Sequence, residues 1–258
     1  MLAIEQLIFS RTDNPSRSHH FQLSIEQLAI NANEFTGLLG PNGAGKSTAL
    51  HLISKELTAS SGSVSLHGTE IEQWPRRELA KHLALLPQAS NVALGFTAAE
   101  VVAMGATPLS LNWRTLQFLV RRFLKLVDAY PFKDRAFMSL SGGQQQRVQL
   151  ARVLLQLTQA EQAPLLLLDE PTAAQDIKQQ HQVLALAKDH AKQGMMVCAV
   201  LHDINHAIQY CDKVAVFNDG QHCMTGSPLE ILSEQSIESV WGYRPCRAHL
   251  SDGAVRFA

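Results

Sequence analysis

The spacing of apolar side chains changes several times along the chain, and each change predicts a different kind of element. In residues 1–70, apolar positions alternate with polar ones or form short runs. A helix that starts at Gly45 interrupts this series, and a polar loop at residues 11–20 separates its first two strands. The pattern predicts strands at residues 3–9, 21–30, 35–39 and 64–66.

Residues 97–157 follow a helical period and predict a helical insertion. Thr97 stands three residues before Glu100, which is the spacing of a capping box, and the apolar run that begins at Val101 comes next. The insertion therefore starts with its own helix signal.

The part of the chain after this insertion predicts a parallel sheet. Short apolar runs at residues 165–168 and 195–201 lie on either side of a helical stretch at residues 177–192. Alternating strands and helices are typical of parallel strands joined by crossover helices. We therefore expect these two strands to belong to one sheet.

Residues 226–258 form an expected C-terminal extension. They predict one or two short helices at residues 228–241, then strands at 246–250 and 254–257 that flank a turn at 251–253. The whole chain has 258 residues, which is long for one average domain and short for two. One large α/β domain is the expected organisation.

The composition supports a globular fold and argues against one class of partner. Hydrophobic residues make up 46% of the chain and charged residues 17%, a balance that excludes disordered and coiled-coil proteins. The 22 Lys and Arg residues against 23 Asp and Glu residues give a formal charge of -1, which creates no field that attracts nucleic acid. We expect no nucleic-acid partner.

Cysteine usage and the apolar runs indicate the compartment. The cysteines at positions 198, 211, 223 and 246 form no C-x-x-C pair and are too few for a disulfide scaffold, which favours a reducing environment. The N-terminal residues do not have the pattern of a secretory signal. The apolar runs are far shorter than the roughly 18 residues of a membrane-spanning helix, so the chain is not expected to cross a bilayer.

Residues 40–47 match the phosphate-loop pattern G-x-x-x-x-G-K-[ST] between an expected strand and an expected helix. In such a loop the glycines let backbone N–H groups approach phosphates, Lys46 places a positive charge on them, and Ser47 offers a hydroxyl to Mg²⁺. The pattern predicts a phosphate site made by Gly40, Pro41, Asn42, Gly43, Ala44, Gly45, Lys46, Ser47 and Thr48.

A second motif supplies two carboxylates. The apolar strand expected at residues 165–168 ends in Asp169 and Glu170, the arrangement called Walker B. Asp169 is suited to hold Mg²⁺, and Glu170 is suited to orient or deprotonate an attacking water. A strand that ends in a solvated Asp-Glu turn is common, so this motif gains its weight from the phosphate loop.

A third motif, L-S-G-G-Q, starts at Leu140 and precedes a helical run. Ser141 is an N-cap candidate, and the backbone N–H groups at the positive end of the helix favour an anion. The alternative is an ordinary capped helix. The candidate residues of this motif are Ser141, Gly142, Gly143 and Gln144.

The order of the motifs resembles that of the ATP-binding subunits of ABC transporters. Along the chain it runs from the phosphate loop through Gln88, L-S-G-G-Q and Walker B to His202, and the resemblance covers about residues 1–226. It implies one ABC ATPase domain over residues 1–258. Its fold class is α/β, a P-loop NTPase with a RecA-like core, an N-terminal antiparallel β subdomain and a helical signature subdomain at about residues 97–157.

The same resemblance implies ATP and Mg²⁺ as cofactors and assigns roles. Gln88 would contact Mg²⁺ and water, His202 would contact the γ-phosphate, and Glu170 would complete the catalytic group. The motif that begins at Ser141 would cover ATP bound to a second, antiparallel copy. The active unit is therefore expected to be a head-to-tail dimer with two composite sites.

One segment departs from the family pattern. The D-loop reads Ala173, Ala174, Gln175 and Asp176, whereas the family usually has a serine first and a leucine third. Asp176 is retained and is counted among the nucleotide-site residues. The presence of Gln175 puts the usual packing across the dimer in question.

Aromatic and histidine side chains leave further alternatives open. The family stacks adenine on an aromatic side chain just after the first strand, and candidates for it are Phe9, His19, His20 and Phe21. His202 and His206 have the i, i+4 spacing of a zinc helix, but Asp203 stands where such a helix needs a glutamate. We do not favour zinc.

Residues 74–80, 96–105 and 147–154 are similar to the subfamily that imports haem, iron-siderophores and cobalamin, and the last of these segments favours haem. The resemblance implies ATP hydrolysis coupled to import through a polytopic permease. A periplasmic substrate-binding protein would deliver the cargo to this permease. The subunit would lie peripherally on the cytoplasmic face of a bacterial inner membrane.

Two other functions and one docking site complete the expectations. A soluble ABC ATPase that acts as an assembly or scaffold module is the alternative from another class. A simple P-loop kinase is disfavoured because it has no use for residues 140–144. The permease is expected to dock beside Gln88, on residues 89–100, with Leu94 as a surface contact. The alternative is that Leu94 and Phe96 pack under the helical lobe.

Overall fold

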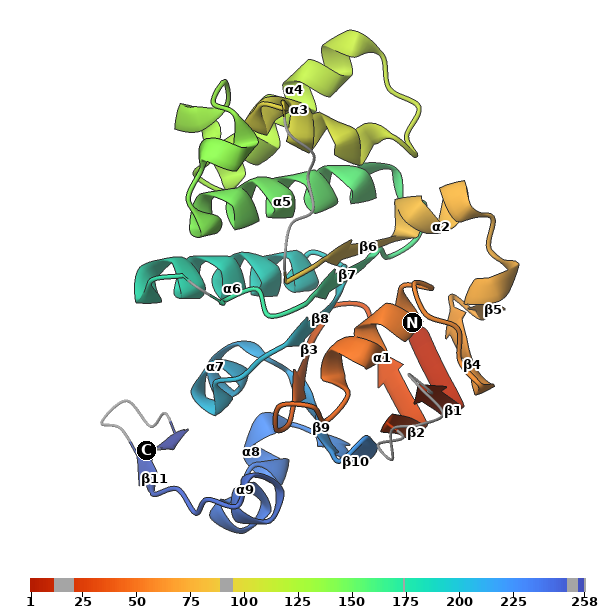
Figure 1. The fold of residues 1–258 in the computed structure, drawn as a ribbon, viewed down its shortest axis with the longest axis vertical. Coiled ribbons are helices and arrows are strands. Elements are labelled where there is room, and N and C mark those ends of the chain that lie inside the picture. Colours follow the sequence, from red (N-terminus) through yellow and green to blue (C-terminus); the bar gives the residue numbers. More distant parts are fainter. Residues whose placement is uncertain (12–20, 89–94, 174, 250–254, 258) are drawn as a thin grey trace, which may run out of the picture.

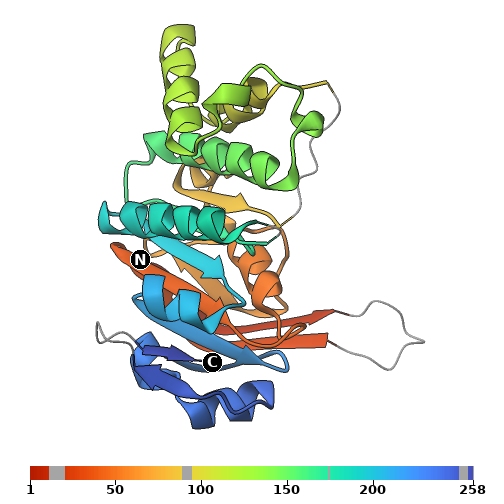
Figure 2. The same cartoon turned by 90° about the vertical axis from the view of Figure 1, so that its left-hand side faces the viewer.

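The computed structural model describes residues 1–258 except 12–20, 89–94, 174, 250–254 and 258. In this described part, a ten-stranded sheet has the order β5-β4-β1-β2-β10-β9-β3-β8-β7-β6. Helices α3, α4 and α5 gather at one end of the molecule, and the C-terminal helices and strands lie at the other (Figures 1 and 2).

One half of the sheet is antiparallel. Its central pair, β1 and β2, has both strands ten residues long, and β1 also pairs with β4 in antiparallel register. This half confirms the β-rich N-terminal lobe, although β1 extends to Arg11, which the sequence had placed in the loop. Its strands are β1 (Leu2–Arg11), β2 (Phe21–Ile30), β4 (Ser61–Leu66) and β5 (Thr69–Glu70).

The other half of the sheet is parallel. The strands β3, β8, β7 and β6 are neighbours in that order, and β9 flanks β3 on its other side, also in parallel. The crossover helix α6 (Ile177–Lys192) joins β7 to β8 and has the predicted bounds. The strands are β3 (Glu34–Leu39), β6 (Leu83–Leu86), β7 (Leu165–Leu168), β8 (Met196–Val200) and β9 (Lys213–Asn218).

Both faces of the parallel half are buried. Leu165 and Leu167 of β7 belong to one apolar cluster, which includes helix α1 (Lys46–Ile53), whereas Leu166 and Leu168 belong to the cluster formed with α5 and α6. Side chains alternate between the faces of a strand, so a strand covered on both sides is apolar at every position. This explains the continuous run of leucines.

The helical insertion forms its own lobe. It contains α3 (Ala98–Ala103), α4 (Trp113–Leu126) and α5 (Gly142–Gln156). The capping box predicted at Thr97 is confirmed, because Glu100 N donates to Thr97 Oγ1 and Thr97 N donates to Glu100 Oε2. Short 3₁₀ turns occur at η1 (Ile71–Gln73), η2 (Met104–Ala106), η3 (Tyr130–Phe132), η4 (Phe137–Ser139) and η5 (Leu157–Gln159).

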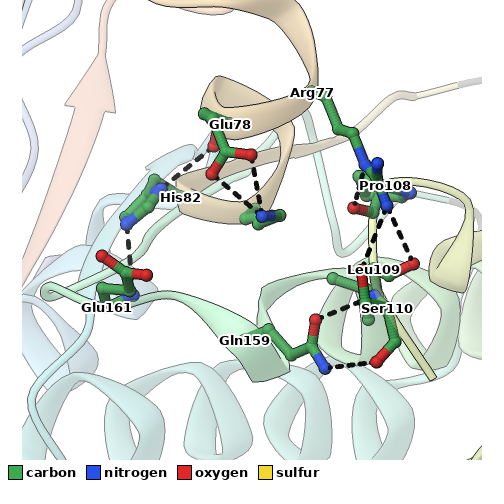
Figure 3. A network of polar contacts seen from close by, with 9 residues as sticks. Arg77, Glu78, His82, Pro108, Leu109, Ser110, Gln159 and Glu161 are labelled. Carbon is green, nitrogen blue, oxygen red and sulfur yellow. Dashed lines mark hydrogen bonds and ion pairs between the residues drawn. The ribbon is translucent and has the colours of Figure 1, made fainter.

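Helix α2 (Arg76–His82) ties the sheet to this lobe (Figure 3). Arg77 Nε donates to the carbonyl oxygen of Pro108 at 2.9 Å, and its guanidinium also reaches Ser110 Oγ at 3.2 Å. The side chain of Gln159 closes the network by bonding both the N–H and the carbonyl oxygen of Ser110. These bonds hold the loop before α4 against the core.

The C-terminal part packs behind the end of β8. It contains α7 (Ile204–Tyr210), β10 (Gln221–Gly226), α8 (Pro228–Ile231), α9 (Glu234–Trp241), β11 (Arg247–His249) and β12 (Val255–Phe257). The predicted pairing of the last two strands is confirmed as antiparallel, while the turn at 251–253 lies outside the described residues. Asn205 of α7 exchanges two hydrogen bonds with the backbone of Phe257, at 2.8 and 2.9 Å.

Several elements were not predicted from the sequence. These are β5, α2, β6, α7, β9 and β10. Among the described helices, none combines the length and apolar character that crossing a membrane requires.

Candidate functional site

Four neighbouring parallel strands bring the predicted site residues to one edge of the sheet. The phosphate loop follows β3, His202 follows β8, Asp169 and Glu170 follow β7, and Gln88 follows β6. The carboxyl ends of parallel strands meet at the same edge, which is where ligands bind in open α/β sheets. The topology therefore assembles residues that are up to 162 positions apart, from Gly40 to His202.

The phosphate loop wraps around Lys46. Its Nζ donates to the carbonyl oxygens of Gly40 and Pro41, each at 2.8 Å, and the side chain is only 5% exposed. Burial lowers the pKa of Lys46, while the nearby charges of Glu170 and Asp169 act in the opposite direction. Gly45, at φ 98°, begins α1, and a Cβ there would lie 2.8 Å from Leu23 Cδ1, so the position needs glycine.

Ser47 and Asp169 form the contact between the loop and Walker B. Ser47 Oγ donates to Asp169 Oδ1 at 2.7 Å. Asp169 is 4% exposed, and this burial raises the pKa of its carboxyl, although the hydrogen bond from Ser47 partly opposes the change. Two hard oxygen ligands thus face each other at the start of α1, as a Mg²⁺ site requires.

The carboxylate of Glu170 is held from two other strands. Its Oε2 accepts a hydrogen bond from Gln88 Nε2 at 2.6 Å, and its Oε1 lies 2.7 Å from His202 Nε2. The backbone of Glu170 has φ 49°, in the left-handed region that non-glycine residues adopt only rarely. These contacts bring together the three side chains that the sequence analysis named as catalytic.

A cavity of about 600 Å³ adjoins these groups. Glu170 lies on one side of it and the aromatic rings of Phe9 and Phe21 also line it. Both rings remain candidates for stacking on a base, whereas His19 and His20 lie outside the described residues. The other residues that line the cavity are Asn42, Gly43, Gly45, Lys46, Ser47, Thr48 and Leu57.

Ser141 to Gln144 and Asp176 do not line this cavity in the described part of the chain. Ser141 and Gly142 are exposed at the start of α5, where Ser141 Oγ accepts from Gln144 N and Ser141 N donates to Gln144 Oε1. Asp176 caps α6, because its Oδ1 accepts from Gln179 N at 2.9 Å. The two helix starts are therefore available to another molecule rather than to this cavity.

The sequence analysis missed two contacts of the site, both made by Gln146. Gln146 of α5 donates from Nε2 to the carbonyl oxygen of Glu170 at 3.4 Å, and its Oε1 accepts from Gln175 Nε2 at 2.6 Å. Glu170 and Gln175 are distant from Gln146 in sequence, so neither periodicity nor a motif could have indicated these contacts. The one sequence feature that pointed to them was the glutamine at position 175, where the family usually has a leucine.

Two other features can now be placed. His206 is buried and packs its ring against that of His181, with 5.2 Å between centroids, so it belongs to the interface between α7 and α6. Leu94 and the rest of residues 89–94 lie outside the described residues.

The arrangement fits a nucleoside triphosphate with Mg²⁺. The loop offers backbone N–H groups and a buried ammonium, the partners that phosphate oxygens need. Ser47 Oγ and Asp169 Oδ1 supply few protein oxygens, which suits Mg²⁺ because this ion usually completes its shell with water and substrate phosphates.

Comparison with known proteins finds a matching family and similar sequences. The sequence profile of the family described as ABC transporter matches residues 23–173. The hemin import ATP-binding protein HmuV of Shewanella denitrificans is 47% identical over 229 residues, which are 88% of this chain and 90% of that protein.

Solved structures match the fold over most of the chain. A metal-chelate type ABC transporter in an inward-facing conformation aligns with a TM-score of 0.81 at 23% identity, over 100% of this chain and 96% of that chain. A dimeric ATP-binding cassette in a post-hydrolysis state, bound to ADP and Pi, aligns with a TM-score of 0.76 at 26% identity, over 88% of this chain and 99% of its own.

Proposed function

Because this chain belongs to the ABC transporter family, we propose that it is the ATP-hydrolysing subunit that powers import of hemin through a membrane permease. The observation that carries the ATPase part is the convergence of Gln88, Glu170 and His202 beside the phosphate loop. The hemin cargo is supported by the relative from Shewanella, which is named for hemin import and matches 88% of this chain.

We assign binding of the triphosphate to residues 40–48. The backbone N–H groups of the loop and the ammonium of Lys46 hold phosphate oxygens. Ser47, Asp169 and Gln88 would hold Mg²⁺, which when bound supplies positive charge that neutralises the phosphates. Phe9 or Phe21 would stack on the adenine, since both rings line the cavity.

Glu170 is assigned as the general base. Its carboxylate orients the attacking water and accepts the proton that the water loses. Gln88 and His202 each contact one carboxylate oxygen, and the hydrogen bond of 2.6 Å from Gln88 together with the 2.7 Å contact of His202 Nε2 limits rotation of the side chain. In the bound state His202 would turn to the γ-phosphate, as the family resemblance implies.

A second copy would complete each site. Ser141, Gly142 and Gly143 lie at an exposed helix start, where N–H groups and the helix dipole favour an anion. We place this end of α5 on the γ-phosphate bound to the other copy, with Asp176 close to the same interface. The head-to-tail dimer therefore has two composite ATP sites.

We place these parts in one domain over residues 1–258, with a helical subdomain at about 97–157 and an extension at about 226–258. The dimer would sit on the cytoplasmic face of the inner membrane, against the permease. A periplasmic substrate-binding protein would deliver cargo to that permease.

The helical lobe contains a groove suited to a helix of the permease. Phe96 and Glu100, from the segment expected to dock, line it together with Trp113 and Leu116 of α4, and its volume is about 680 Å³. Trp113 is 71% exposed. An exposed aromatic side chain at the edge of an apolar groove is typical of a protein-binding surface.

Trp113→Glu tests this docking and the transporter assignment together. We expect the variant to keep its melting temperature and its ATPase activity without permease, and to lose at least about tenfold in capture of the permease from detergent-solubilised membranes. Position 113 is the first residue of α4, where a negative charge suits the helix dipole. Phe118→Glu is the matched control, because Phe118 is 64% exposed on α4 but does not line the groove.

Equal capture by both variants would contradict the docking site. If the unmodified protein captures no polytopic membrane protein at all, the transporter assignment fails and the alternative of a soluble assembly module is favoured.

A further inference from the structure

Two glutamine side chains connect the signature helix α5 to the main chain of Glu170. Gln175 Nε2 donates to Gln146 Oε1 at 2.6 Å and to the carbonyl oxygen of Pro171 at 3.1 Å. Gln146 Nε2 in turn donates to the carbonyl oxygen of Glu170 at 3.4 Å. We call these three contacts the glutamine relay.

The relay acts on a backbone that needs support. Glu170 has φ 49°, a region that costs free energy for a residue with a side chain and persists only when neighbours fix it. Gln88 and His202 contact the carboxylate, whereas the carbonyl oxygen of Glu170 accepts from Ala173 N at 3.1 Å and from Gln146 Nε2 at 3.4 Å. Gln146 thus adds a side-chain contact to the backbone contact on this peptide plane, and the direction of the carboxylate depends on both sets of contacts.

Gly143 lies where the start of α5 approaches the residues around the start of α6. A Cβ at this position would lie 2.8 Å from Gln179 Oε1 and 3.8 Å from Gln175 Cγ. The helix and the segment that leads into α6 therefore approach closely, in agreement with their adjacent positions in Figures 1 and 2. A movement of α5 would be transmitted to Gln175 and to Glu170.

The glutamine at position 175 carries an unfavourable contribution to stability beside its two hydrogen bonds. Its Oε1 is buried and has no hydrogen-bond partner among the described residues. Burying an unpaired amide oxygen is unfavourable, and the leucine that the family usually has there would bury no such atom. The hydrogen bonds of Gln175 to Gln146 and Pro171 are then the feature that distinguishes the two side chains.

We propose that Gln175 and Gln146 are positioning residues for ATP hydrolysis, which keep Glu170 aligned and link it to the helix whose start faces the other copy. This inference rests on the ATPase activity of the proposed function. Through the relay, α5 couples the composite site to which it contributes Ser141 with the site that contains its own Glu170.

The test is Gln175→Leu in the purified full-length protein. We expect kcat for ATP to fall about tenfold, because a small misplacement of a catalytic group lowers the rate strongly, while KM changes less than about twofold. The melting temperature should change little, because the loss of two hydrogen bonds is offset by removal of the buried, unpaired oxygen. Gln182→Leu, at an exposed position of α6, is the matched control and should leave kcat unchanged.

Gln146→Leu and the double variant complete a cycle. If both glutamines act through one relay, the double variant should be no slower than the slower single variant, instead of showing the product of the two effects. Multiplicative effects would overturn the relay.

Three further outcomes would overturn the inference. A kcat of Gln175→Leu within about twofold of the unmodified protein would do so, as would a fall in kcat accompanied by a lower melting temperature, which indicates a structural role. Absence of hydrolysis in the unmodified protein would overturn both the relay and the proposed function. If only the relay fails, the unmodified protein still hydrolyses ATP, so the two failures can be distinguished.

Discussion

Glu170→Gln is expected to bind ATP as tightly as the unmodified protein and to hydrolyse it about 10²- to 10⁴-fold more slowly, the usual range for loss of a general base. The amide keeps the shape of the side chain and its acceptor for Gln88, but it cannot take a proton from water. The phosphate contacts of Lys46 are untouched, so affinity should remain.

Calorimetry with ATP and a phosphate-release assay measure the two properties separately. Glu161→Gln, at an exposed position in the connection before β7, is the matched control and should behave as the unmodified protein. Hydrolysis by Glu170→Gln at a near-normal rate would show that Glu170 is not the base.

Ser141→Arg is expected to abolish ATPase activity while ATP binding to the isolated subunit persists. Ser141 is exposed at the N-cap of α5, so the larger side chain enters no core, and loss of the cap costs only about 1 kcal/mol. In the dimer that side chain would occupy the γ-phosphate site of the other copy. Ser239→Arg, exposed on α9, is the control.

Mixing Ser141→Arg with Glu170→Gln tests the composite sites. Each variant is expected to be inactive alone, but a mixed dimer has one site that combines Glu170 of one copy with Ser141 of the other. Activity should therefore reappear on mixing, and mixtures that stay inactive would contradict the composite sites.

Elements with a strong local signal could be predicted from the sequence. The phosphate loop, the leucine strand β7 and helix α6 each carry a motif, a continuous apolar run or a regular period, and α6 and β7 have the predicted bounds. The hairpin of β9 and β10 was missed although it had a signal. Asp219 and Gly220 lie between these strands with φ 45° and 74°, as a two-residue turn requires.

The candidate site was predictable as a set of residues but not as a set of contacts. Motif order indicated Gln88, Glu170 and His202, yet their contacts with one another depend on the strand order β8-β7-β6, which no local pattern contains. The contact of Gln146 with Gln175 joins residues 29 positions apart, one in α5 and the other just before α6. Such contacts arise only from tertiary packing.

Transport of hemin tests the central claim most directly. The measurement uses vesicles that contain the co-purified permease and this subunit, with ATP inside, hemin and its binding protein outside, and Glu170→Gln as the matched control. We predict that hemin accumulates inside only with ATP and only with the unmodified subunit. ATP hydrolysis at the normal rate without hemin movement, or equal accumulation with Glu170→Gln, would contradict the account.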